Sequence, residues 1–222
     1  MISLMEDNDA DISIIQMKYI AENINEECAE LEVEKVSVMN AERAIEESLY
    51  QRLYSCCAPA KLFRRSAIGE IRFPLGRISE DLAICHLFLN NACKIVYSNY
   101  YGNYYRQHES SIMHVFNPRR LDALEWAKEI ENFCIKKHPT ILGEAYCRTL
   151  NVAVHLVLDL PDCGEIHDHY FVGIWDEVKR SRIKTLLDKK VRNREKVAAL
   201  LSFGGEKMLK AVLNSKVAVR KD

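Results

Sequence analysis

The sequence predicts an α/β region up to about residue 115, followed by a mainly α-helical region over 116–222. Two observations support this prediction. Short β-branched segments alternate with helical patterns in the first part of the chain. From Asn117 onward, apolar residues recur at helical spacing. The length of 222 residues allows one large domain, or one domain with a substantial addition.

The first part contains several short candidate elements. The segment Ala10–Ile15 is β-branched and bounded by polar residues, which predicts a strand. In the segment Asn40–Tyr54, apolar residues at helical spacing follow Asn40, the expected N-cap. Residues 58–68 are predicted as a loop or short strand with one helical turn, and residues 69–77 as a Pro/Gly loop. A helix is predicted to begin at Ser79. It is followed by a strand over 94–99 and a separate extended piece over 100–107.

The second part is predicted to hold four helices. The first begins at Asn117 and Pro118, a good cap and first-turn pair. The expected ranges are 117–138, 140–160, 176–191 and 194–213, with the last helix broken at Gly204–Gly205.

Composition indicates a globular protein with reduced thiols. The chain is 48% hydrophobic and 28% charged, and it has neither an apolar run long enough for a membrane span nor a secretory signal pattern. The eight cysteines form no CxxC pair, so we expect a cytoplasmic protein with free thiols.

Charge is distributed unevenly along the chain. Residues 1–47 carry 13 acids and 3 bases, whereas residues 179–222 carry 14 bases and 4 acids. The basic end could be a solvated helical face, or it could contact an anionic membrane surface. Nucleic-acid binding is not expected, because aromatic residues are almost absent from this segment.

Two adjacent acids, Glu80 and Asp81, stand between a Pro/Gly loop and an apolar run. Acids in the first turn of a helix interact favourably with the helix dipole, so both residues could be ordinary helix-start acids. The same helix-start amides would keep Asp81 ionised and able to accept a proton from a substrate.

Three further segments contain residue types that are typical of ligand-binding or metal-binding sites. Tyrosines and Arg106 cluster in the segment Tyr100–Met113, which fits either a sugar or phosphate ligand or a solvated edge strand. The segment 163–171 contains Cys163, His167 and His169, but their spacing fits no standard zinc pattern, so we predict a polar interhelical loop. The Asp9–Ile12 segment leads directly into a strand, so we reject its Asp-x-Asp string as a metal site.

Four motifs in order give the chain a resemblance to the acceptor half of a bacterial family 2 glycosyltransferase of the GT-A fold. They are "NDADISI", "PAKLFRRSAI", "IRFPLGRISEDLAICHLFL" and "KIVYSNYYGNYYRQHESSIMH". The resemblance implies an incomplete GT-A-like, that is Rossmann-like, sheet over 1–115, and a helical C-terminal region over 116–222 that is similar to the family's variable helical bundle.

The resemblance also implies an activity and a set of site residues. The activity is an inverting, hexosyltransferase-like transfer of a sugar from a nucleotide-sugar donor to a hydroxyl in surface polysaccharide synthesis. Asp81 matches the catalytic base, and Glu80 precedes it in the acceptor pocket. The other matched substrate-binding residues are Lys61, Tyr105, Arg106 and Ser111.

The family's N-terminal nucleotide-binding half, with its Asp-x-Asp site for Mg²⁺ or Mn²⁺, has no counterpart in this sequence. We therefore expect an N-terminally truncated enzyme or, alternatively, a non-catalytic interaction module or pseudoenzyme. The expected partners are a nucleotide-sugar donor, a lipid-linked or oligosaccharide acceptor, and a second copy or a separate donor-domain chain. The expected location is the cytoplasm at the inner face of the plasma membrane, which the basic segment 179–222 would contact.

Overall fold

The computed structural model describes residues 1–20, 35–106 and 116–218, and side chains as far as residue 214. The chain divides into two compact units. We call residues 1–76 with 80–114 the sheet unit, and residues 77–79 with 115–222 the helical unit. The fold is mixed α/β, as the sequence predicts. The interpretation of the first unit as the acceptor side of a transferase stays a prediction.

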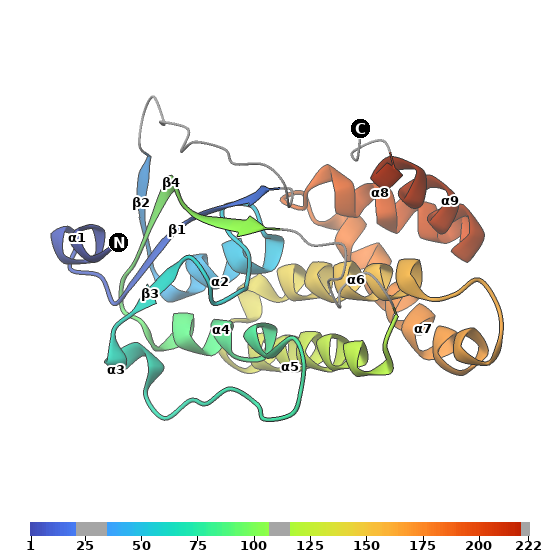
Figure 1. Ribbon diagram of the computed structural model, residues 1–222, viewed down its shortest axis with the longest axis horizontal. Coiled ribbons are helices and arrows are strands. Elements are labelled where there is room, and N and C mark those ends of the chain that lie inside the picture. The colour runs from blue at the N-terminus through green and yellow to red at the C-terminus, as the bar shows by residue number, and fades with distance from the viewer. Residues whose placement is uncertain (21–34, 107–115, 219–222) are drawn as a thin grey trace. The chain divides into compact units, whose positions relative to one another are not determined.

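A four-stranded mixed sheet forms the centre of the sheet unit, in the order β2-β4-β1-β3 (Figure 1). The central strands β1 and β4 are parallel, whereas the two short edge strands pair with them antiparallel. Parallel strands are usually buried on both faces, and Ile12–Ile15 of β1 are all buried. The strand bounds are Ile12–Ile20 (β1), Val36–Met39 (β2), Lys61–Phe63 (β3) and Ile95–Arg106 (β4).

Strand β4 bulges against β1. From the pair Ile14–Tyr97 to the pair Gln16–Tyr101, β4 uses two residues more than β1. From there to the pair Met17–Asn103 it uses one more, which is Gly102. A Cβ at Gly102 would lie 2.6 Å from Cδ1 of Ile15, so a larger residue would require neighbouring side chains to shift. The extended conformation predicted over 100–107 is confirmed up to Arg106, but its separation from the preceding strand is wrong, because it continues the strand that begins at Ile95.

Four helices accompany the sheet: α1 (Ile2–Asp7), α2 (Ala41–Tyr50), α3 (Arg65–Ile68) and α4 (Glu80–Asn91). The predicted cap at Asn40 is confirmed, since its side chain accepts a 2.9 Å hydrogen bond from the Arg43 amide. Helix α2 ends four residues earlier than predicted, because Gln51 adopts a left-handed conformation with φ of +53°. Ser79 precedes α4 with φ of +56° rather than the extended conformation usual for an N-cap.

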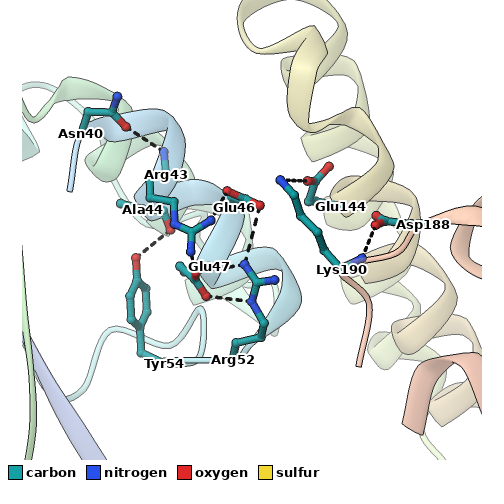
Figure 2. A network of polar contacts seen from close by, with 10 residues as sticks. All are labelled: Asn40, Arg43, Ala44, Glu46, Glu47, Arg52, Tyr54, Glu144, Asp188 and Lys190. Carbon is teal, nitrogen blue, oxygen red and sulfur yellow. Dashed lines mark hydrogen bonds and ion pairs between the residues drawn. The ribbon is translucent and has the colours of Figure 1, made fainter. Parts of the chain in front are cut away.

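Two buried carboxylates hold the end of α2 to the chain that follows it (Figure 2). Glu46 and Glu47 are 5% and 2% exposed, and both pair with Arg43 and Arg52. Buried charges are stable only when they are paired in this way. The Tyr54 hydroxyl donates a hydrogen bond of 2.6 Å to the Ala44 carbonyl. These contacts fix the segment 51–54, which leads into the candidate site.

The helical unit contains five α-helices within its described residues: α5 (Asp122–Lys137), α6 (Leu142–Asp159), α7 (Glu165–Leu187), α8 (Asn193–Leu201) and α9 (Gly205–Ala218). The predicted cap at Asn117 is confirmed, because its side chain accepts a hydrogen bond from the Arg119 amide. The predicted break at Gly204–Gly205 is also confirmed, and Gly205 has a φ of +87° that favours glycine.

Helix α7 begins at Glu165, eleven residues before its predicted start. The predicted polar interhelical loop over 163–171 is therefore wrong for its helical residues, among them His167 and His169. The His167 ring stacks on Phe171 at 4.7 Å, and Phe171 stacks on Trp175 at 5.4 Å. These contacts, spaced four residues apart on one helix face, stabilise the early turns.

Ion pairs also cross the interior of the helical unit. Arg180 of α7 donates two hydrogen bonds of 2.8 Å to the buried Glu131 of α5. In the same unit, the Lys190 ammonium lies 3.9 Å from the Glu144 carboxylate, and the Lys190 backbone amide donates a hydrogen bond to Asp188 (Figure 2). Within the described ranges, no helix combines the length and apolarity that crossing a bilayer requires.

Candidate functional site

Asp81 is the second residue of α4, and its side chain is half-buried in the sheet unit. Its carboxylate accepts a hydrogen bond from the Ala58 backbone. Lys61, at the start of β3, lies close enough to favour the ionised form, whereas the neighbouring Glu80 disfavours it. The structure therefore places Asp81 beside the segment that leads from α2 to β3.

Burial has the largest influence on Asp81 and raises the pKa of its carboxyl. The Ala58 hydrogen bond and the charge of Lys61 lower the pKa but do not outweigh burial. The position of Asp81 at a helix start did not predict this influence of burial. A raised pKa makes the carboxylate a stronger proton acceptor than an exposed aspartate.

Lys61 organises the loop in front of Asp81. Its ammonium donates hydrogen bonds to the backbone carbonyls of Ser55, at 2.9 Å, and of Cys57. The same ammonium lies 5.3 Å from the centre of the Tyr54 ring. Two of its three donors therefore hold the loop, and the loop carries the amide of Ala58 that contacts Asp81.

Two exposed tyrosines lie where the central strands end. Tyr19 of β1 pairs in register with Tyr105 of β4, and their ring centres are 5.4 Å apart. Partial burial of the ring raises the pKa of Tyr19, and nearby Cys57, Tyr105 and Cys56 add to this effect in that order. The pair of rings therefore lies beside the loop that Lys61 organises.

The remaining predicted site residues differ in how far the structure describes them. Arg106 is the last residue of β4, is exposed, and pairs in register with Ile20. Glu80 is exposed at the first position of α4. Ser111 lies outside the described residues.

A group of thiols lies beside the carboxylate. Cys85 stands one helical turn after Asp81 and is buried, and burial raises the pKa of its thiol. The titratable groups near it are Lys61, Cys56, Asp81 and Cys57. A buried thiol with a raised pKa is a weak nucleophile, so Cys85 acts here as an apolar packing residue.

An apolar pocket of about 400 Å³ adjoins this region of the sheet unit. Its walls include Phe63, Phe73 and Phe88, and the Phe63 and Phe88 ring centres are 5.2 Å apart. Ala58 also lines the pocket, whereas Asp81 does not. Ala58 therefore lies both at the apolar pocket and beside the carboxylate that it contacts.

Within the described ranges, no group of three or more His, Cys, Asp or Glu side chains is placed to hold a metal ion. In the Asp-x-Asp string, the Asp11 carboxylate accepts hydrogen bonds from the backbone amides of Cys93 and Lys94 at 2.7 and 3.2 Å. Asp11 therefore joins the start of β1 to the start of β4, as expected for a residue that leads into a strand.

Some basic side chains of the segment 179–222 are engaged in contacts within the helical unit. Arg182 donates a hydrogen bond to the Ser202 carbonyl, and its guanidinium lies 3.9 Å from the centre of the Phe203 ring. Lys210 is 7% exposed and bonds the Leu160 carbonyl at 2.7 Å. These contacts reduce the charge that the segment presents to a partner.

Sequence reasoning missed Tyr19, Ala58 and Cys85. The alternation of side chains continues past Ile15, and following it to Ile20 would have placed Tyr19 on the strand that ends at the site. The spacing of four residues between Asp81 and Cys85 on a predicted helix would have paired those two. No sequence signal identifies the Ala58 amide, because its contact depends on the loop conformation.

No protein-family model matches the chain, and no curated protein is similar enough in sequence to count as a match.

Proposed function

We propose that this protein acts in glycosyl transfer, with Asp81 as the base that accepts the proton of an acceptor hydroxyl. The proposal is supported above all by the half-buried Asp81 carboxylate with its raised pKa, held by the Ala58 amide near Lys61. The parallel pair β1 and β4 is compatible with a Rossmann-like sheet, in which ligands bind at the carboxyl ends of strands. Tyr19 and Tyr105 lie at that end.

In this reaction the acceptor oxygen attacks the anomeric carbon of the donor sugar as Asp81 takes the hydroxyl proton. The bond between that carbon and the diphosphate breaks, and the nucleoside diphosphate leaves with the electron pair. The exposed Tyr19 and Tyr105 rings offer flat faces for a sugar. Arg106 and Ser111 are the residues proposed to face the leaving diphosphate, whose charge requires stabilisation. A divalent metal would supply the same stabilisation.

The proposed partners follow from the same chemistry. The donor is a nucleotide sugar and the acceptor is a hydroxyl of a lipid-linked or oligosaccharide substrate, as in surface polysaccharide synthesis. At the inner face of the plasma membrane, the protein would contact anionic lipids through the basic side chains of 179–222 that remain at the surface, such as the exposed Arg194 and Lys207.

The test is the Asp81→Asn variant of the intact protein or assembly, assayed for nucleoside diphosphate release with a panel of nucleotide sugars. Loss of a general base is expected to slow transfer by about 10²- to 10⁴-fold. Glu6→Gln, which removes an exposed acid of the same unit, is the matched control and should leave the rate unchanged. Transfer at the normal rate by a folded Asp81→Asn variant would refute the proposal.

The second candidate is a non-catalytic binding module derived from such a transferase. One observation favours it: the apolar pocket of the sheet unit does not include Asp81 in its lining. The two candidates differ in one measurement. A binding module would retain its ligand affinity but release no nucleoside diphosphate from any donor of the panel.

A further inference from the structure

The pocket lined by Phe63, Phe73 and Phe88 combines an apolar interior with positive charge. Ile68 and Ile71 complete its apolar walls. Its volume of about 400 Å³ lies within the usual range of small-molecule sites. The pocket is also bordered by exposed apolar surface, since Phe73 is 44% exposed and lies 6.2 Å from Phe88 between ring centres.

Two arginines, Arg65 and Arg72, line the same pocket, and both are exposed. The Arg72 guanidinium donates hydrogen bonds to the Gly69 and Ile71 carbonyls, which holds it at the pocket. No side-chain hydrogen bond or ion pair of Arg65 occurs within the described part of the chain. Guanidinium groups are well suited to bind phosphate or carboxylate oxygens.

The pocket and the candidate base lie along one face of the same helix. Asp81, Cys85 and Phe88 are spaced by four and three residues on α4, so their side chains point in similar directions. Seven residues of helix correspond to about 10 Å along the axis. A ligand with an apolar group against Phe88 could therefore extend past Ala58 toward Asp81.

We propose that this pocket binds an anionic amphiphile, a molecule whose apolar chain lies among the phenylalanines and whose phosphate or carboxylate meets Arg65. Charge complementarity and the apolar lining support this class of ligand. The inference deepens the proposed function and depends on it only where the amphiphile is taken as the acceptor. Binding to the pocket is a separate property that can be measured without turnover.

The experiment measures binding of decyl phosphate to the full-length protein below the micellar concentration, by calorimetry. Decanol and inorganic phosphate are the two comparison ligands, because decanol has the apolar chain without the phosphate and inorganic phosphate has the anion without the chain. We expect decyl phosphate to bind at least about tenfold more tightly than either, the factor that one charge-assisted hydrogen bond or one apolar contact supplies.

Two variants test the residues, and two matched variants control them. Arg65→Ala and Phe73→Ser should each weaken decyl phosphate binding by about tenfold. Lys35→Ala removes one exposed charge of the sheet unit, and Leu75→Ser removes a 95% exposed apolar side chain outside the pocket lining. Neither control should change the affinity.

A third variant, Ile71→Trp, fills the pocket without opening a cavity and should abolish binding. Equal affinity of all folded variants, or equal affinity for decanol and decyl phosphate, would overturn the inference. Inorganic phosphate competing fully with decyl phosphate would also overturn it, because the site would then be an anion site alone. Decyl phosphate binding without sugar transfer would support the binding site and refute the proposed transferase activity. Sugar transfer that Ile71→Trp leaves unaffected would support the transferase activity and refute the pocket as an acceptor site.

Discussion

The ammonium of Lys61 donates a hydrogen bond of 2.9 Å to the carbonyl of Ser55. Residues 55–58 have no regular secondary structure, so this bond and a second one to the Cys57 carbonyl hold the loop that contacts Asp81. Lys61 was predicted from the resemblance as a substrate-binding residue. Its contacts in the structure give it a positioning role in front of the candidate base.

Replacing Lys61 by Met should loosen this loop and alter Asp81. Loss of the two charge-assisted hydrogen bonds is expected to lower the free energy of unfolding by about 1–2 kcal/mol. The pKa of Asp81 should rise further, since Lys61 lowers it in the native protein. Denaturant unfolding and an NMR titration of the Asp81 carboxyl measure the two effects. Lys35→Met is the control, and a falling Asp81 pKa in the Lys61→Met variant would contradict the assignment.

The pair formed by Arg180 and Glu131 should contribute more to stability than a surface pair on the same helix. Arg180→Met removes the arginine from the buried Glu131 carboxylate, which keeps its hydrogen bond from the Thr149 hydroxyl. We expect a loss of about 2 kcal/mol, between the values for exposed and buried pairs. Lys179→Met breaks the exposed pair with Asp176 and should cost about 0.5 kcal/mol or less. Equal losses for the two variants in denaturant unfolding would contradict this prediction.

His167 should make the stability of the helical unit depend on pH. Hydrogen bonds with Glu206 and then Asp168 raise the pKa of His167. A raised folded-state pKa stabilises the protein fully below the unfolded value of about 6.5 and loses that effect as pH rises through the folded pKa. The free energy of unfolding of the native protein should therefore exceed that of His167→Gln most clearly below pH ~6.

Denaturant unfolding of both proteins across this pH range measures the effect. His169→Gln, which removes an exposed histidine two residues later on α7, is the matched control. A stability difference between the native protein and His167→Gln that grows above neutral pH would have the wrong sign and would reject the assignment.

Gly102 should tolerate substitution less well than an ordinary strand residue. An added Cβ would lie 2.6 Å from Cδ1 of Ile15 and 2.9 Å from Cε1 of Tyr100. We expect Gly102→Ala to destabilise the protein by about 1–2 kcal/mol. Gly173→Ala is the matched control, because no atom lies within 4 Å of its added Cβ and it stands inside α7. That control should raise stability by up to about 1 kcal/mol, and thermal melts of both variants decide the comparison.

Local sequence signals predicted several features of the fold correctly. The Asn40 cap, the Asn117 cap and the break at Gly204–Gly205 each depend on one residue and its immediate neighbours. Strand β2 was not predicted, because Val36 and Val38 are exposed and the segment is only four residues long. Its pairing with β4 stabilises it as a strand.

Some features of the candidate site could likewise be predicted from the sequence, and others could not. The sequence identified Asp81 and the first-turn position that it occupies, but not the burial that raises its pKa, nor the Ala58 amide that contacts it. It identified Tyr105 but not Tyr19, whose ring meets Tyr105 because β1 and β4 are parallel neighbours in register. Both missing features come from residues distant in the chain.

The sequence by itself determined the order of the α/β and helical regions, the caps, the glycine break and the position of the paired acids. Only the tertiary structure decided the early start of α7, the bulge at Gly102, the environment of Asp81 and the pocket beside it. The physical reason is range: caps and periodicity act within a few residues, whereas burial and cross-strand contacts depend on segments that meet only when the chain has folded.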